Sequence, residues 1–320
     1  MRLIFMGSGT FAVPSLEAVA RSEHDLVALV AQPDKPAGRG HRLRMPKTKP
    51  IAMSLGIPVH QPEKIRSEEA VILLNRLAPD CITVVAYGQI IPRSILSIPR
   101  KGIVNVHGSL LPAYRGAAPI QWAIARGEVE TGVTTMLMDE GLDTGPILLS
   151  KRIPIADDET AMTLEPKLAD AGAELLLETL GGLERETIVP VAQDESLASL
   201  APRIKKEHAR IEWNWPATRI DRCIRAFQPW PGAFVLRKGV ALKLLEASPR
   251  AGLFDGSPGT IVSFEGDGLV VACGMRTALV VTRVQAPDRA AMSAAAFARG
   301  RRLSPGDSLA EPESGEFPAL

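Results

Sequence analysis

The chain has 320 residues, of which 46% are hydrophobic and 23% are charged, with a formal net charge of +1. No apolar run reaches the roughly 18 residues that a membrane-spanning helix needs, and the short apolar N-terminus is typical of a buried strand rather than a signal peptide. The three scattered cysteines, Cys81, Cys223 and Cys273, predict neither a disulfide framework nor a zinc site. We therefore expect a cytoplasmic globular protein that is long enough for two domains.

Charge is distributed unevenly along the chain. Residues 1–200 carry 20 Lys and Arg against 24 Asp and Glu, whereas residues 201–310 carry 17 against 9. A basic second half can mark a polyanionic partner, but a solvated surface with a chance bias explains the charge equally well.

The first half of the chain alternates expected strands with expected helices. Buried apolar or β-branched runs predict strands at residues 2–6, 26–31, 81–85, 103–107, 133–138 and 147–155. Apolar spacing predicts helices at residues 11–21, 68–77, 117–126 and 160–180, and Pro166 is expected to break or restart the last of them. This alternation predicts an α/β domain with a Rossmann-like, doubly wound, mostly parallel sheet.

The pattern changes after an irregular, proline-containing stretch at residues 187–202, where we expect a linker. Beyond it, a helix at 218–227 precedes short strands at 233–237, 240–246, 260–264, 269–273 and 278–284. Short strands joined by glycine turns predict a small antiparallel β-barrel domain of the OB-like type. The expected plan is a catalytic domain at 1–189, a linker at 190–206, the OB-like domain at 207–310 and a disordered tail at 311–320.

The first glycine cluster, GSGTFA at residues 7–12, follows an expected strand and precedes an expected helix. It matches the G-x-G-x-x-A fingerprint of dinucleotide-binding folds, which is a weak signal when it stands alone. The acidic partner should lie about 20 residues on, but Asp25 and Asp34 lie before and after the second strand. A tight turn that needs glycine for backbone room explains the cluster more simply.

The segment 102–119 carries the strongest chemical signal in the chain. Asn105 and His107 lie two apart near the end of an expected strand, so both side chains face the same side. When an amine attacks a formyl carbon, an amide N–H can stabilise the developing oxyanion and an imidazole can accept or relay the proton. Asp143, in a glycine-flanked turn, is the expected third member because a carboxylate would orient the His107 ring, although a plain Asx turn is the simpler alternative.

These motifs resemble the folate-dependent formyltransferase family. The resemblance rests on NVHGSLLP, YRGAAPIQ and GLDTG, and it extends from Met1 to about Leu309. It includes MGSGTFAVPSL, QPDKPAGRG, AQDESLASLAPRIKKEHARIEW, RAFQPWPGAF and MSAAAFARG. The chain is most similar to the members that formylate methionine on initiator tRNA. The resemblance implies transfer of the formyl group of 10-formyltetrahydrofolate to the α-amino group of initiator methionyl-tRNA, without a metal, for translation initiation.

The resemblance also implies roles for particular residues. Asn105, His107 and Asp143 match the family's catalytic residues, and its folate-contacting segment corresponds to Ser109, Leu110, Leu111 and Pro112. Residues 32–49 hold six cations and one acid, which by composition alone indicates a flexible, solvated loop. The resemblance implies that this loop enters the acceptor-stem end of the tRNA. The expected tRNA contacts are Lys35, Arg39, Arg42, Arg44, Lys47, Lys49, Lys205 and Lys206.

Three alternatives remain open on the sequence. A formyltransferase for a small amine, such as a nucleotide sugar, would explain the Asn105, His107 and Asp143 set but not the basic loop. A nicotinamide-dependent oxidoreductase would use the glycine turn, and a non-catalytic RNA-binding module would leave the Asn-x-His strand without a role. Trp213, Trp215 and Trp230 are candidate stacking residues, but we expect them in a core. We also expect a monomer.

Overall fold

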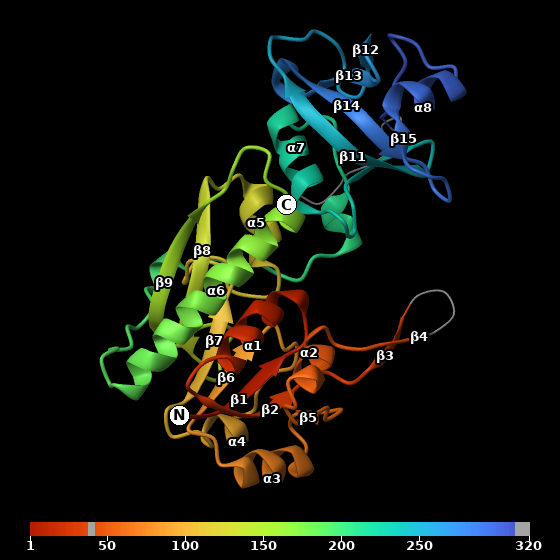
Figure 1. The fold of residues 1–320 in the computed structure, drawn as a ribbon. Helices are drawn as coiled ribbons and strands as arrows, with labels where there is room; N and C mark the ends of the chain where they lie inside the picture. Colours follow the sequence, from red (N-terminus) through yellow and green to blue (C-terminus); the bar gives the residue numbers. More distant parts are fainter. Residues whose placement is uncertain (38–41, 311–320) are drawn as a thin grey trace. The chain divides into compact units, whose positions relative to one another are not determined.

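The computed structural model describes residues 1–37 and 42–310 (Figure 1). The chain forms two compact units. The first unit comprises Met1–Ile120, Val129–Ile155 and Thr163–Pro202. The second comprises Gln121–Glu128, Ala156–Met162 and the described residues from Arg203 on.

The first unit is built on a seven-stranded sheet with the order β5-β2-β1-β6-β7-β8-β9. Its strands are β1 (Arg2–Gly7), β2 (Asp25–Val30), β5 (Val59–His60), β6 (Cys81–Val85), β7 (Ile103–His107), β8 (Glu130–Leu137) and β9 (Ile147–Pro154). Strands β5, β2, β1, β6 and β7 are parallel to one another, whereas β8 pairs antiparallel with both β7 and β9. All five residues of β6 are buried, as expected for a strand covered on both faces.

Helices cover both faces of this sheet. They are α1 (Val13–Ala20), preceded by the short η1 (Thr10–Ala12), α2 (Thr48–Ser54), α3 (Glu68–Leu77), α4 (Arg93–Leu96) and α6 (Ala161–Glu184). Most of a further helix, α5 (Pro119–Arg126), belongs to the second unit. The side chains of β1 alternate between the two resulting cores. Leu3 and Phe5 share one core with residues of α1 and α6, and Ile4 and Met6 share the other with residues of α3 and α4. The predicted α/β class with a doubly wound sheet is confirmed.

Helix α6 differs from the expectation at Pro166. The helix runs without a break from Ala161 to Glu184 and contains Pro166 near its first turns. Leu164 and Leu168, on either side of the proline, are fully buried. Their packing holds the helical path although the ring removes one backbone hydrogen bond. The expected break is therefore wrong.

The second unit contains an antiparallel sheet with the order β10-β11-β14-β13-β12, and β15 pairs with β14. Its elements are α7 (Ala217–Ala226), β10 (Phe234–Arg237), β11 (Val240–Arg250), β12 (Ile261–Glu265), β13 (Gly268–Cys273), β14 (Thr277–Gln285), β15 (Met292–Ser293) and α8 (Ala294–Gly300). Ile220 and Ile224, one turn apart on α7, are both buried. The predicted small antiparallel domain is confirmed.

Trp213, Trp215 and Trp230 have different environments. Trp213 is buried, and the Arg219 guanidinium lies 3.9 Å from the centre of the Trp215 ring. Trp230 is 56% exposed, so the core position that we expected for it is wrong.

All three cysteines are buried. Burial raises the pKa of the Cys81 and Cys273 thiols to about 12 and that of Cys223 to about 11. Within residues 1–37 and 42–310, no helix is long and apolar enough to cross a membrane.

Candidate active site

The candidate site lies where β7 ends. Asn105 pairs with Val84 of β6 on one side and with Met136 of β8 on the other, and His107 pairs with Thr134. Asn105 is partly exposed, whereas His107 is buried. Because side chains alternate along a strand, both residues face the same side of the sheet, as expected.

Backbone contacts fix the orientation of the His107 ring. Its Nε2 lies 2.9 Å from the carbonyl oxygen of Tyr114. A carbonyl oxygen can only accept a hydrogen bond, so Nε2 carries the hydrogen and the neutral ring has its lone pair on Nδ1. Nδ1 lies 3.7 Å from the Asp143 Oδ2 atom, which is within ion-pair distance but longer than a hydrogen bond. The structure therefore brings His107 and Asp143 together.

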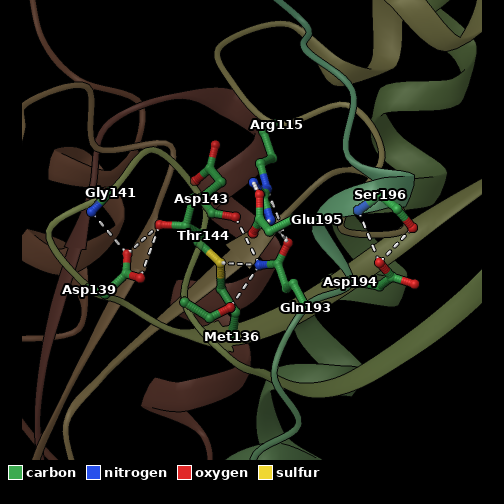
Figure 2. Close-up of polar contacts among 11 residues, drawn as sticks. Arg115, Met136, Asp139, Gly141, Asp143, Thr144, Gln193, Asp194, Glu195 and Ser196 are labelled. Atoms are coloured by element: carbon green, nitrogen blue, oxygen red, sulfur yellow. Dashed lines mark hydrogen bonds and ion pairs between the residues drawn. The ribbon is translucent and has the colours of Figure 1, made fainter.

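The Asp143 carboxylate is held by the backbone of Gly116, the residue after Arg115. Its Oδ2 accepts a hydrogen bond of 2.8 Å from the Gly116 N–H. The φ angle of Asp143 is 55°, which is in the left-handed region that few residues other than glycine adopt. The Asx turn that we weighed for Asp143 is instead made by Asp139, whose carboxylate accepts from the Gly141 N–H and the Thr144 hydroxyl (Figure 2).

The predicted folate segment follows His107 directly. Ser109 is buried, and its hydroxyl donates to the Ala113 carbonyl oxygen at 2.6 Å. The Thr134 hydroxyl donates to the Ser109 carbonyl and accepts from the Leu111 N–H, which anchors the segment to β8. Leu111 is buried, and Leu110 and Pro112 are partly exposed. The Ser109 side chain thus has a structural partner, and the folate contacts of the segment stay a prediction.

A polar network that we did not anticipate surrounds Arg115. This side chain is only 6% exposed, and its guanidinium donates to Gln193 Oε1 and to both carboxylate oxygens of the exposed Glu195 at 2.7–3.1 Å (Figure 2). The hydrogen bonds between the Arg115 guanidinium and the Glu195 carboxylate raise the pKa of Arg115 and lower the pKa of Glu195. Further backbone bonds join Arg115 to Ser199 and Ala201. Residues 190–202, which we expected to be part of a linker, lie within the first unit.

The glycine turn after β1 serves packing. A Cβ atom at Gly7 would lie 2.8 Å from the Val85 carbonyl oxygen, so a side chain would not fit there. Both acids that could have completed a dinucleotide site are bound to other side chains. Asp25 pairs with Arg2, and Asp34 accepts from Lys49 Nζ and Gln61 Nε2, each at 2.7 Å. These two hydrogen bonds lower the pKa of Asp34, with that from Gln61 the larger cause.

A basic cleft of about 330 Å³ lies beside the glycine turn. It is lined by Ser8, Gly9, Thr10, Gln32, Lys35, Arg44, Met45, Pro46 and Lys47. Strands β3 (Lys35–Ala37) and β4 (Arg42–Arg44) form an antiparallel hairpin at its edge, where we had expected a flexible loop. The cleft therefore gathers three cations in one place.

The other predicted tRNA contacts have different positions. Lys49 Nζ lies 2.7 Å from Asp34, and its contact with tRNA stays a prediction. Arg39 lies outside the described residues, and Arg42 is described in its backbone only. Lys205 and Lys206 belong to the second unit, where Lys205 Nζ lies 3.5 Å from Glu207.

Comparison with protein families gives matches along both units. A family described as "Formyl transferase" matches residues 1–180, and one described as "Formyl transferase, C-terminal domain" matches residues 203–302. The chain is 52% identical to a methionyl-tRNA formyltransferase of Anaeromyxobacter dehalogenans over 94% of its own length and 97% of that protein. It is 49% identical to a methionyl-tRNA formyltransferase of Trichlorobacter lovleyi, over 96% of each chain.

Solved structures with the same fold are more distant in sequence. The sugar 3N-formyltransferase WlaRD, solved with dTDP and 5-N-formyl-THF, matches with a TM-score of 0.67 at 19% identity, over 91% of this chain and 99% of its own. An N-formyltransferase from Helicobacter canadensis, in complex with folinic acid and dTDP-3-aminofucose, matches with a TM-score of 0.66 at 20% identity, over 88% and 98%. At this level of identity the likeness shows the fold alone.

Proposed function

The chain belongs to the formyl transferase family, and we propose that it transfers the formyl group of 10-formyltetrahydrofolate to the α-amino group of methionine on initiator tRNA. The observation that carries this proposal is the approach of His107 Nδ1 to Asp143 at the end of β7, beside the partly exposed Asn105. Relatives that are about half identical over nearly the whole length are methionyl-tRNA formyltransferases, which supports the same substrates here.

We assign one step of the chemistry to each of the three residues. The methionine nitrogen attacks the formyl carbon, a C–N bond forms, and the carbonyl electron pair moves onto oxygen. The Asn105 amide N–H stabilises this oxyanion. His107 Nδ1 takes the proton from the attacking nitrogen, and Asp143 stabilises the resulting imidazolium. Collapse of the intermediate breaks the bond to N10, and the proton held by His107 passes to N10, so that the products are formylmethionyl-tRNA and tetrahydrofolate.

The basic cleft is an argument that the methionine amine is carried by a nucleic acid. Lys35, Arg44 and Lys47 line it together with the turn that follows β1. A Cβ atom at Gly108 would lie 3.6 Å from the Phe11 ring of the same turn, so this turn also borders the end of β7. Cations beside the site can neutralise phosphates of the tRNA end that enters it. A cytoplasmic monomer remains our expectation.

Formyl transfer with three amine acceptors tests the proposal. Purified protein with 10-formyltetrahydrofolate is expected to formylate methionyl initiator tRNA, and to leave free methionine and a nucleotide-linked amino sugar almost untouched. Asn105→Ala is expected to lower kcat by about 100- to 1000-fold, because one oxyanion donor is lost, with tRNA affinity unchanged. Transfer to the amino sugar but not to the tRNA would refute the proposed substrate, and near-normal turnover of the variant would refute the role of Asn105.

A further inference from the structure

Two segments far apart in the sequence meet in a polar network around the buried Arg115 side chain, which we call the Arg115 clamp (Arg115, the partly buried Gln193 and the exposed Glu195). The Gln193 side chain is its centre, because its amide contacts two other segments at once. Its Oε1 accepts from Arg115 Nε and Nη2, and its Nε2 donates to the carbonyl oxygens of Asp143 at 2.9 Å and of Gly145 at 2.7 Å. Figure 2 shows this amide between the guanidinium and the turn that bears Asp143.

The clamp holds the two functional side chains through their backbone partners. Tyr114, which precedes Arg115, accepts from His107 Nε2, and Gly116, which follows it, donates to the Asp143 carboxylate. The segment that fixes both His107 and Asp143 is therefore anchored at its centre by the Arg115 side chain. Gln193 joins this anchor to the backbone of Asp143 itself.

The backbone of both held segments is strained. Tyr114 has a φ of 63° and Asp143 a φ of 55°. Non-glycine residues in this region cost about 1–3 kcal/mol each and persist only where their surroundings enforce the conformation. The clamp can enforce these conformations. The oxygen of the Gln193 side-chain amide binds Arg115 and its nitrogen binds the turn that bears Asp143, while four hydrogen bonds from the guanidinium hold Arg115 in place.

We infer that Gln193 is a positioning residue for formyl transfer, acting through Arg115 and the Asp143 turn to keep the Asp143 carboxylate beside His107. This inference rests on the proposed function for its kinetic consequence. A displacement of about 1 Å at reacting groups can cost on the order of 100-fold in rate. Gln193 needs no contact with either substrate to have this effect.

The chain offers a matched control within the same stretch. Asp194, the next residue, accepts from the backbone and hydroxyl of Ser196 and not from the turn that bears Asp143, among the residues that the structure describes (Figure 2). Gln193→Ala is expected to lower kcat by about 10- to 100-fold, with the KM for both substrates changed less than about threefold. Asp194→Ala is expected to keep kcat within about threefold of the wild type. Gln193→Glu keeps the acceptor for Arg115 but places an oxygen against the two carbonyl oxygens of the turn. Its kcat is expected to fall at least as far as that of Gln193→Ala.

Two further measurements separate positioning from a general structural role. Gln193→Ala combined with Asp143→Asn is expected to have the kcat of Asp143→Asn alone within about threefold, because one residue acts through the other. Amide hydrogen exchange at residues 139–145 and at Gly116 is expected to quicken by about tenfold or more in Gln193→Ala and to stay unchanged in Asp194→Ala. Additive kinetic losses, or equal exchange in the two single variants, would overturn the inference.

Amide hydrogen exchange also tests this inference independently of the proposed function, because it does not depend on enzymatic activity. If the wild type forms no formylmethionyl-tRNA, the proposed function fails, and the exchange comparison still decides whether Gln193 holds the Asp143 turn. If Gln193→Ala does not fold, the same comparison is made with Gln193→Glu, whose length and acceptor are retained.

Discussion

Two glycine-marked turns of the first unit look alike in sequence and do different things. In the turn at residues 7–12, Gly7 leaves no room for a side chain because the chain passes close to β6, whereas Gly9 does have room for one. In the turn at residues 139–145 neither glycine has room for a Cβ atom, and this turn adds a strained aspartate and a set of side-chain hydrogen bonds. Glycine spacing thus reports close backbone approach in both turns, and only the polar contacts distinguish the one that carries the proposed chemistry.

The largest expected effect is the difference in kcat between a substitution in the turn at residues 139–145 and one in the turn at residues 7–12. Asp143→Asn keeps an acceptor for the Gly116 N–H but removes the charge beside His107, so kcat is expected to fall by about 10²- to 10⁴-fold. Ser8→Ala in the first turn removes an acceptor for the Gln32 N–H and is expected to keep kcat within about threefold. Single-turnover rates at saturating substrate measure both. Equal losses in the two variants would end the distinction.

Alanine at a glycine of each turn sharpens the comparison through stability. A Cβ atom at Gly145 would overlap the Leu137 carbonyl oxygen, so Gly145→Ala is expected to lower the free energy of unfolding by about 3 kcal/mol, the upper end for overpacking. Gly9 has a φ of −80° and an ordinary contact of 3.5 Å to Ala86, so Gly9→Ala is expected to leave stability unchanged or to raise it by up to about 1 kcal/mol. Urea denaturation of both variants checks the opposite signs.

The basic cleft beside the first turn is expected to matter for tRNA affinity. Replacing Lys35, Arg44 and Lys47 together by alanine removes the three cations of the basic cleft. The slope of log affinity for tRNA against log salt should become shallower by up to about three units, while stability should change little because exposed substitutions lie within about 0.5 kcal/mol. Arg21→Ala, an exposed change on another part of the unit, is the control. Unchanged slopes would show that the cleft does not contact the tRNA.

The smallest effect concerns Asp34, whose carboxylate is bound by Gln61 and Lys49. The pKa of Asp34 is lowered in the folded protein, so its ionised form favours folding above the usual carboxyl pKa of about 4. At neutral pH the wild type is expected to have a higher Tm than Asp34→Asn. This difference is expected to vanish as the pH falls through the lowered pKa of Asp34. A difference that grows at low pH would contradict this sign.

Local signals explain which elements could be predicted from the sequence. Helix α3 and strands β6 and β7 have the predicted bounds, because Ser67 caps α3 and β-branched runs form the strands. Helix α2 was missed because contacts with the glycine turn fix its start, including the Thr48 hydroxyl bond to the Gly7 carbonyl. The Asn-x-His strand and the GLDTG turn pointed to the site. Gln193 and Glu195 lie about 50 residues further on in an irregular stretch, and nothing in their local pattern showed that this stretch packs against Arg115.

The burial of the cysteines makes the chain suitable for chemical labelling. With thiol pKa values of about 11 to 12, fewer than about one in a thousand of these groups is a thiolate at pH 7.5, against about one in ten for an exposed cysteine. Leu142, on the turn that bears Asp143, is 63% exposed. Maleimide should therefore react with Leu142→Cys far faster than with any native thiol, and a single fluorophore there would follow the motion of that turn during turnover.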